Sequence, residues 1–301
     1  MTAFDGISPM IWLDHGAEEA ANLYVSLFPN ARITDVVRVA TEIPSNNPVG
    51  SVLTVGFEIE GQSFVALNGG PYFKLNPSIS FFVNCDTADE VEMLFARLAD
   101  GGTELMPLQA YPFSEKFGWV QDRFGMSWQI NLGSRRQKID LALMFSKPHE
   151  GQAGEAIRFY TSVFDGSHID RIEHYADGDE GGTPGMVKIG TFQLGGRSFA
   201  AMDSSYDHGF TFNEALSLSV GCASQAEIDA FWAVLSADPE SEQCGWCKDR
   251  FGVSWQVVPV ELNQMMLSPD PEQVRRVTEA FMPMKKLDLA ALRKAYAGEQ
   301  E

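Results

Sequence analysis

Short runs of alternating apolar and polar residues recur along the chain and are separated by amphipathic segments. Residues 7–14 alternate in the way that a strand does, and residues 16–28 place apolar side chains on one face of a helix. Three more alternating runs follow at residues 31–39, 51–61 and 62–70, the last two joined by a tight turn. The first 70 residues therefore predict one strand, one helix and three strands.

The same order of elements starts again at residue 78. Thr87 and Glu90 have the spacing of a capping box, which predicts a helix that ends at Gly101. Three further alternating runs follow at residues 103–108, 116–122 and 126–132. The second half of the chain repeats the pattern, with a second capping box at residues 224–227. We therefore predict an α+β fold built from four strand-helix-strand-strand-strand units.

The chain contains an internal duplication. The fourteen residues that start at Trp119 recur from Trp246 with eight identities and an offset of 127 positions. The helical segment around Tyr24 matches the segment around Tyr160, and the short motif at Phe64 matches that at Phe199. The second copy lacks most of a loop that precedes Trp119 in the first copy, and loops are where copies drift.

The duplication sets the predicted domain boundaries. Residues 1–136 form the first copy, residues 137–262 form the second copy, and residues 263–301 form a helical extension. Asp270 and Asp288 each stand where an N-cap would start a short helix of that extension. Its apolar residues must cover a surface, which is either the chain's own sheet or a dimer contact. They are Met265, Met266, Phe281, Met282 and Met284.

The net charge of the chain bears on which classes of partner it can bind. The formal net charge of −19 opposes binding to nucleic acid or to an anionic membrane, since both would repel the chain. No apolar run approaches the roughly 20 residues that span a bilayer, and the first ten residues do not resemble a signal peptide. We therefore expect a cytoplasmic protein, either a monomer or a homodimer, that interacts with neither nucleic acid nor membrane.

The cysteines and histidines do not form a recognisable site. Cys244 and Cys247 have the spacing of a redox or zinc motif, but the first copy has Phe117 and Val120 there, so strand residues with an exposed thiol are the simpler interpretation. The five histidines lie in or beside loops without helical or strand spacing between them. Four cysteines are too few for a disulfide framework in a chain of 301 residues.

The repeated motif Asp-Arg-Phe-Gly lies between two alternating runs in each copy, at Asp122 and at Asp249. In the structural interpretation it turns a hairpin, with the carboxylate accepting from backbone amides and the glycine at positive φ. In the functional interpretation Arg123 and Arg250 bind an anion. Both interpretations are compatible with the presence of the motif in both copies.

These motifs resemble a known family. Paired strand-helix-strand-strand-strand units are similar to those of the vicinal oxygen chelate superfamily, which includes glyoxalase I and bleomycin-resistance proteins. The segments at residues 23–28 and 159–164, with those starting at Trp119 and Trp246, resemble its PhnB-like branch, often labelled 3-demethylubiquinone-9 3-methyltransferase. The resemblance extends from about residue 5 to residue 297. It implies tandem glyoxalase-like domains with cup-shaped mixed sheets.

In metal-dependent relatives, the resemblance places a metal-binding glutamate near the end of the last strand, where this chain has Gln129 and Gln256. The other ligand positions fall near residues 8–10, at Ala66 and at Ser78 or Ser80 in the first copy. In the second copy they fall at Asp140, Ala201 and Ser217 or Ser219. Neutral amides and hydroxyls bind divalent ions far more weakly than carboxylates. Among these positions only Asp140 could bind a metal ion, and one carboxylate with a glutamine does not make a site. We therefore expect no metal and no cofactor.

Strand alternation and the resemblance together give a set of pocket candidates with polar, uncharged and aromatic side chains. They are Trp12, Asn68, Ser80, Phe82, Trp119, Gln129, Asp203 and Gln256. Asn68 in the first copy corresponds to Asp203 in the second. The longer loop of the first copy offers Tyr111, Pro112 and Phe113 as a lid, so we expect the ligand in that copy.

Two functions remain open at this stage. A metal-independent protein that binds a small molecule needs only such a pocket. The alternative is an enzyme of the same superfamily that acts on a small aromatic or hydroxylated substrate, with Asp14, Asp140 or Asp203 as its carboxylate. The methyltransferase label has no support from a glycine-rich turn of the kind that binds S-adenosylmethionine in a doubly wound sheet.

Overall fold

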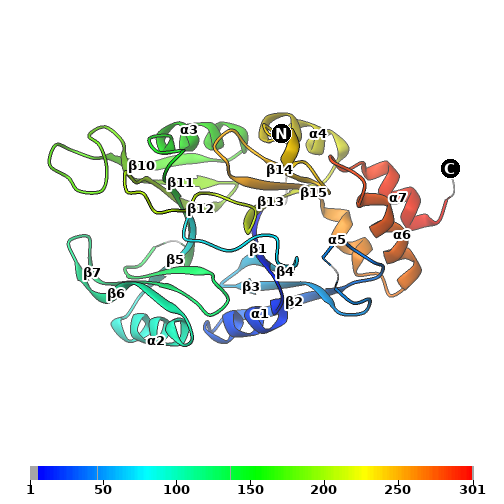
Figure 1. Ribbon diagram of the computed structural model, residues 1–301, viewed down its shortest axis with the longest axis horizontal. Coiled ribbons are helices and arrows are strands. Elements are labelled where there is room, and N and C mark those ends of the chain that lie inside the picture. Colours follow the sequence, from blue (N-terminus) through cyan, green and yellow to red (C-terminus); the bar gives the residue numbers. More distant parts are fainter. Residues whose placement is uncertain (1–5, 46, 136, 300–301) are drawn as a thin grey trace. The chain divides into compact units, whose positions relative to one another are not determined.

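The computed structural model describes residues 6–45, 47–135 and 137–299. It contains two compact units, each with its own mixed sheet. Unit 1 consists of residues 1–73 together with residues 213–301, and unit 2 consists of residues 74–212. Figure 1 shows the elements of both units in chain order.

Unit 1 combines the two ends of the chain. Its first part contains β1 (Ile7–Leu13), α1 (Ala17–Ser26), β2 (Ala31–Arg38), β3 (Val52–Ile59) and β4 (Gln62–Asn68). Its second part contains β13 (Leu216–Cys222), α4 (Gln225–Leu235), the 3-10 helix η1 (Pro239–Ser241), β14 (Trp246–Lys248) and β15 (Ser254–Pro259). The strands form a seven-stranded sheet in the order β14-β15-β13-β1-β4-β3-β2.

Unit 2 contains the middle of the chain. Its first part has β5 (Ile79–Cys85), α2 (Ala88–Ala99), β6 (Thr103–Tyr111), β7 (Ser114–Gln121) and β8 (Ser127–Leu132). Its second part has β9 (Ile139–Phe145), α3 (Ala153–Val163), β10 (His168–His174), β11 (Val187–Leu194) and β12 (Arg197–Asp203). The eight-stranded sheet has the order β10-β11-β12-β9-β5-β8-β7-β6.

Each sheet is formed by halves of the two sequence copies. In unit 1, β1 pairs antiparallel with β13, and Ser8 lies opposite Ser219. In unit 2, β5 pairs antiparallel with β9, and Phe82 lies opposite Asp140. The predicted boundaries at residues 1–136, 137–262 and 263–301 divide the chain by its repeats, whereas the compact units combine one half of each repeat.

The predicted α+β fold class is confirmed. The last of the four strand-helix-strand-strand-strand segments differs from the prediction in one detail. After α4 it has a 3-10 turn and two strands, whereas the segment that contains α2 has three strands after its helix. The missing strand corresponds to β6, which lies in the segment before Trp119 that the second copy lacks. As a result, the short strand β14 forms the edge of the unit 1 sheet.

The helix starts follow the predicted capping chemistry. The Thr87 hydroxyl accepts a hydrogen bond from the Glu90 backbone N–H at 3.2 Å, and the Ser224 hydroxyl accepts one from Glu227 at 3.3 Å. Each glutamate carboxylate reaches back to the backbone N–H that precedes the cap residue. These bonds satisfy amide groups that a helix cannot pair internally.

The repeated Asp-Arg-Phe-Gly motif is a hairpin turn in both units. The Asp122 carboxylate accepts from the backbone N–H groups of Phe124 and Met126 and from Trp128 Nε1. Asp249 makes the equivalent bonds to Phe251, Val253 and Trp255 in unit 1. The motif glycines have φ values of 90° and 83°, in the left-handed region. The structural interpretation of this motif is therefore confirmed.

Each sheet has one face against helices and one face that lines the cup. In unit 1 the helix-facing side is closed by Tyr24, Phe57 and Phe64, and the last two rings stack at 5.3 Å. Phe192 and Phe199 stack in the same way in unit 2, at 5.5 Å. These rings are almost fully buried, so they form the cores on which the strand registers depend.

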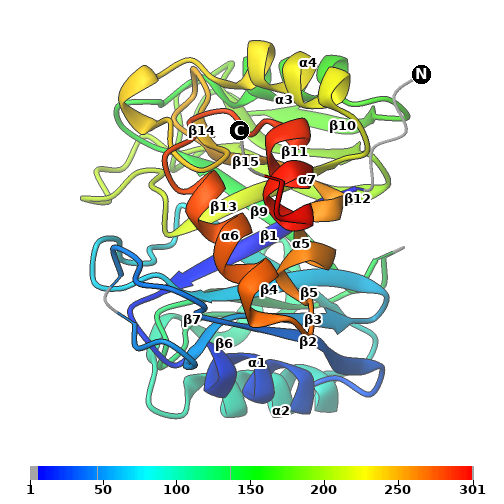
Figure 2. The same ribbon diagram turned by 90° about the vertical axis from the view of Figure 1, so that its right-hand side faces the viewer.

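The C-terminal extension is helical, as predicted. It contains α5 (Val260–Met266), α6 (Pro271–Phe281) and α7 (Leu289–Ala297). Asp270 and Asp288 cap α6 and α7 through their side chains, as the sequence predicts. Figure 2 shows the three helices lying together, with α5 continuing directly from β15. Among the helices of the described residues, none combines the length and apolar character needed to cross a membrane.

Candidate functional site

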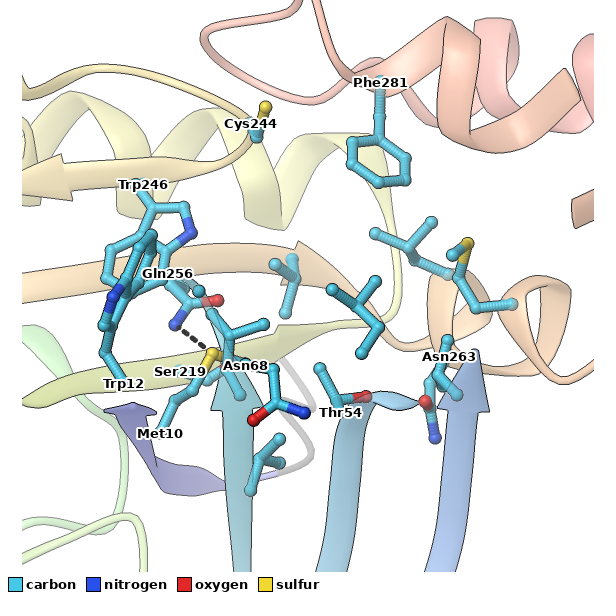
Figure 3. A pocket seen from close by; sticks show the side chains of 18 of the residues that line it. Met10, Trp12, Thr54, Asn68, Ser219, Cys244, Trp246, Gln256, Asn263 and Phe281 are labelled. Carbon is cyan, nitrogen blue, oxygen red and sulfur yellow. Dashed lines mark hydrogen bonds between the residues drawn. The ribbon is translucent and has the colours of Figure 1, made fainter. Parts of the chain in front are cut away.

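Unit 1 contains a cavity of about 990 Å³ on the cup side of its sheet. Alternation along the strands sends one set of side chains into this space, including Met10, Thr54, Val65, Leu67 and Ser219. The sides of the cavity come from the loop around Tyr72, from β14 and β15, and from the C-terminal helices. Figure 3 shows strands entering from two directions with a helix opposite them. The volume lies in the range of small-molecule sites.

Three aromatic rings form one end of the cavity. The Trp12 ring lies edge-on to Phe73 at 5.0 Å and to Trp246 at 5.7 Å between centroids. Trp12 Nε1 donates to the Gly70 carbonyl at 2.8 Å, which fixes the orientation of the indole. A Cβ at Gly69 would lie 2.1 Å from the Trp12 ring, so only glycine fits there. We call Trp12, Phe73 and Trp246 the aromatic corner.

The polar groups beside the aromatic corner are uncharged. Gln256 is almost fully buried, and its Nε2 donates to Ser217 Oγ at 2.8 Å and approaches Met10 Sδ at 3.0 Å. Ser219 lies next to Gln256 in the strand register. Amide, hydroxyl and thioether groups suit a neutral ligand better than a charged one.

The C-terminal helices supply the wall opposite the strands. Leu262 and Met266 of α5 and Phe281 of α6 line the cavity, together with Met282. The Cys244 thiol donates to the Met282 carbonyl at 3.3 Å, and burial raises the pKa of this thiol to about 11. The apolar residues of the extension therefore pack onto the chain's own unit 1, as one of the two sequence-based alternatives predicts.

The side chains at the expected metal positions of unit 1 are uncharged. In unit 1 the cup-side groups are Ser8 and Met10 on β1, Val65 and Leu67 on β4, and two serines and a glutamine on β13 and β15. Zinc and other transition-metal ions prefer imidazole, thiolate and carboxylate ligands. Within the described ranges, no group of three or more His, Cys, Asp or Glu side chains is placed to hold a metal ion.

Four of the predicted pocket residues lie together in unit 2. Phe82 and Trp119 both pair with Gln129 in the strand registers, so the three side chains share the cup face. Trp119 Nε1 donates to Ser127 Oγ at 2.7 Å, and this hydroxyl also bonds to Ser80 Oγ at 2.9 Å. Trp12, Asn68 and Gln256 lie in unit 1, so the predicted set is divided between two cups.

Asp203 is not a pocket residue, which corrects the sequence-based assignment. It lies on the helix-facing side of β12, where its carboxylate accepts from the backbone N–H groups of Ala153 and Val187. Burial raises the pKa of the Asp203 carboxyl, and these hydrogen bonds partly oppose that effect. Asn68 has the equivalent role for α1, although it also borders the unit 1 cavity. Ala66 is likewise buried under the helix rather than on the cup face.

Asp140 is the one expected carboxylate that does lie in a cup. It is 2% exposed on β9 of unit 2, where Asn84 Nδ2 donates to it at 3.2 Å. Arg135 Nη1 lies 3.5 Å from the same carboxylate oxygen. Burial raises the pKa of the Asp140 carboxyl, and the bond from Asn84 and the charge of Arg135 oppose the shift.

The predicted lid belongs to unit 2. Tyr111 stacks on Phe113 at 5.5 Å, and both rings contact Phe117 edge-on. None of the three is among the residues that line the unit 1 cavity. Asp14 is exposed and lies 3.5 Å from His15, outside both cups.

Sequence reasoning missed Phe73, Trp246 and the helical wall. Trp246 could have been found, because it matches Trp119, which was among the candidates. Phe73 had no such signal. Met266, Phe281 and Met282 were predicted to cover a surface, but nothing in the sequence assigned that surface to a cavity. These residues line one cavity only because residues 1–73 and residues 213–301 fold together in unit 1.

The comparisons with known proteins agree with the fold. The family model of 3-demethylubiquinone-9 3-methyltransferase matches residues 5–131 and again residues 137–258. The chain belongs to this family. It is a tandem PhnB-like member of the glyoxalase and bleomycin-resistance superfamily. The C-terminal helices lie beyond the matched residues.

Among solved structures, a Bacillus cereus PhnB protein labelled 3-demethylubiquinone-9 3-methyltransferase is 37% identical. It covers 41% of this chain and 96% of its own, with a TM-score of 0.39. A Staphylococcus aureus protein is 33% identical over 42% of this chain and 96% of its own, with a TM-score of 0.18. A glyoxalase I variant from Zea mays is 10% identical and covers 86% of this chain and 94% of its own, with a TM-score of 0.52, so it supports the fold alone. Among curated proteins, no match was found.

Proposed function

We propose that the protein binds an apolar, uncharged small molecule in the unit 1 cavity and that it does so without a metal ion. The observation that carries this proposal is the combination of a cavity of about 990 Å³ with walls of aromatic, aliphatic and thioether side chains. Burial of apolar surface supplies most of the free energy of binding at such a site.

The residues at the metal positions support the metal-free part of the proposal. Met10, Ser219 and Gln256 offer a thioether, a hydroxyl and an amide, and Gln256 is already bonded to Ser217. A metal-dependent isomerase or dioxygenase would need anionic or imidazole ligands there. This chain shares its fold with PhnB-like proteins and glyoxalases. The neutral side chains at its metal positions favour the binding of a small molecule over metal-dependent catalysis.

Two of the three carboxylates that line the cavity, Glu214 and Asp35 but not Glu240, have hydrogen-bond donors within the chain. Glu214 accepts a hydrogen bond from Lys248 at 2.6 Å, and Asp35 accepts one from the Thr34 hydroxyl at 2.7 Å. Of the three carboxylates that the catalytic alternative named, Asp14 is exposed and Asp203 accepts from two backbone N–H groups in unit 2. Asp140 lies in the other cup, where it accepts from Asn84 Nδ2 and lies 3.5 Å from Arg135 Nη1. A general base needs to reach a proton of the substrate, and Asp35, Glu214 and Asp203 each hold another partner.

The first test is native mass spectrometry with elemental analysis of gently purified protein. We expect no stoichiometric divalent metal, and we expect a co-purified neutral molecule or an otherwise bare chain that binds the neutral fluorescent probe N-phenylnaphthylamine. Treatment with a chelator should leave that binding unchanged. A metal present at one equivalent, whose removal abolishes probe binding, would contradict the proposal.

A matched pair of variants locates the site. Leu67 lines the unit 1 cavity, and Met202 is its counterpart on the cup face of unit 2. Leu67→Trp should fill the cavity and weaken probe binding by at least ~10-fold, because the added ring displaces the ligand. Met202→Trp should leave the affinity within about twofold. The opposite result would place the ligand in unit 2.

A further inference from the structure

The two tryptophans of the repeated motif have different hydrogen bonding. In unit 2, Trp119 Nε1 donates to Ser127 Oγ at 2.7 Å, so the indole is held by its own sheet. The matching residues of unit 1 are Trp246 and Ser254. Ser254 Oγ is buried and has no hydrogen-bond partner in the described part of the chain. Trp246 instead contacts the ring of Trp12.

The Trp246 N–H is available to a ligand. Among the described residues it has no acceptor, whereas Trp12 Nε1 of the same corner is bonded to Gly70. Figure 3 shows the Trp246 indole with its nitrogen on the cavity side of the ring. Trp246 is half-buried, so a ligand that fills the cavity displaces water from its N–H. A ligand that supplies an acceptor in place of that water is favoured over a ligand that does not.

Gln256 offers the complementary acceptor. Trp246 and Gln256 are direct partners in the register of β14 and β15, which brings their side chains to the same place. The amide nitrogen of Gln256 is used by Ser217 and Met10. The amide is therefore oriented with its oxygen toward the cavity, as Figure 3 shows.

We infer that Trp246 and Gln256 are the specificity-determining pair of the unit 1 cavity, and that they select a neutral, flat ring carrying a hydrogen-bond acceptor next to a donor. The acceptor of the ligand takes the Trp246 N–H, and its donor bonds to Gln256 Oε1. The ring packs against the aromatic corner. This inference rests on the proposed function and adds the chemical class of its ligand.

The test uses three uncharged bicyclic probes and equilibrium dialysis against the full chain. Carbostyril has a lactam N–H beside a carbonyl, N-methylcarbostyril lacks the donor, and naphthalene lacks both groups. We expect carbostyril to bind the wild type roughly 10-fold more tightly than its N-methyl derivative, because the derivative leaves Gln256 Oε1 without a partner.

The variants separate hydrogen bonding from packing. Trp246→Phe keeps a ring and removes the N–H, so it should weaken carbostyril about fivefold or more and leave naphthalene within about twofold. Gln256→Met should show the same selectivity. Trp119→Phe, the matched change in unit 2, should affect no probe.

The outcomes also distinguish this inference from the proposed function. If naphthalene and carbostyril both bind the wild type but Trp246→Phe weakens them equally or not at all, the pair is not specificity-determining and the binding function stands. If Trp119→Phe causes the selective loss instead, the assignment to unit 1 is wrong. If no probe binds up to its solubility limit, both the inference and the proposed function fail.

Discussion

Asn68 and Asp203 accept hydrogen bonds from the first residues of equivalent helices in the two units. The Ala17 N–H donates to Asn68 Oδ1 at 2.9 Å, and the Ala153 N–H donates to Asp203 Oδ1 at 3.1 Å. The second atoms of the two side chains have opposite roles. Asn68 Nδ2 donates to the Val52 carbonyl, whereas Asp203 Oδ2 accepts from the Val187 N–H.

This difference predicts that the two residues cannot be exchanged. Asn68→Asp places a carboxylate oxygen against the Val52 carbonyl. Asp203→Asn can keep the bond from Ala153 to Oδ1, but its amide N–H then lies against the Val187 N–H. Each change should lower the free energy of unfolding by about 1–3 kcal/mol, because a polar contact that is partly buried at Asn68 and buried at Asp203 becomes repulsive. Urea unfolding would measure the loss. Asp165→Asn on an exposed loop is the control and should change stability by less than about 0.5 kcal/mol. Tolerance of both exchanges would contradict these hydrogen-bond assignments.

The repeated turn motif gives a second prediction. Asp249→Ala removes the acceptor of the buried Trp255 Nε1 and of two backbone N–H groups, so it should cost about 2–4 kcal/mol of stability. Arg250 packs its guanidinium over the Phe251 ring at 4.9 Å, and Arg250→Ala should cost no more than about 1 kcal/mol. Thermal unfolding of the two variants separates these effects. Loss of anion binding in Arg250→Ala, without loss of stability, would instead support the anion-binding interpretation.

Asp140 makes stability depend on pH. Its folded-state pKa is raised by burial, so the carboxyl binds its proton more tightly in the folded chain than in the unfolded chain. The stability contributed by this group is complete below the unfolded-state pKa of about 4 and is lost as pH rises through the folded-state pKa. The stability of Asp140→Asn relative to the wild type should therefore rise with pH over this interval and then become constant.

Urea unfolding of both proteins at several pH values, at fixed ionic strength, measures this difference. The other titrating groups are common to the two proteins and cancel to first order. Asn is the matched replacement because it has the shape of the protonated acid. A relative stability that falls with increasing pH would show that Arg135 and Asn84 lower the Asp140 pKa more than burial raises it.

We expect the Cys244 thiol to react slowly with an alkylating reagent, and more slowly still when a ligand occupies the cavity. Burial raises the pKa of Cys244 to about 11 and that of Cys247 to about 12, so little reactive thiolate is present at neutral pH. Cys244 is half-buried at the cavity, whereas Cys247 is 1% exposed. Iodoacetamide should label Cys244 before the other cysteines, more slowly than a free thiol. A bound cavity ligand should slow the labelling further. Rapid labelling of Cys247 would contradict the described burial.

The helical wall predicts a packing effect on affinity. Phe281→Ala removes a ring that lines the cavity opposite the strands, so the affinity for a neutral apolar probe should fall by about 1–2 kcal/mol. Arg275 lies on the exposed side of the same helix, where it forms ion pairs with Glu272 and Glu279. Arg275→Ala should therefore leave the affinity for the probe unchanged. Probe titrations compare the two. Equal losses would indicate that the helix as a whole, rather than the ring, determines the affinity.

Much of the fold could be predicted because its signals are local. Alternation, capping boxes and the turn motif each act within a few residues. The predicted elements lie where the sequence places them, apart from one strand after α4 that is absent and the helix α5, which was not predicted. The pocket residues were harder to predict. The faces of Ala66 and Asp203 were assigned to the cup, whereas β4 and β12 turn those positions toward their helices.

The sequence by itself determined the duplicated architecture, the family, the helix starts and the neutral residues at all the expected metal positions except Asp140. The tertiary structure alone decided that the first and fourth units share one sheet, and that Trp12, Phe73, Trp246 and the C-terminal helices meet around one cavity. The physical reason is that all four units have similar apolar faces, so several pairings satisfy the same local pattern. The choice among them depends on how complete side chains pack across distant parts of the chain.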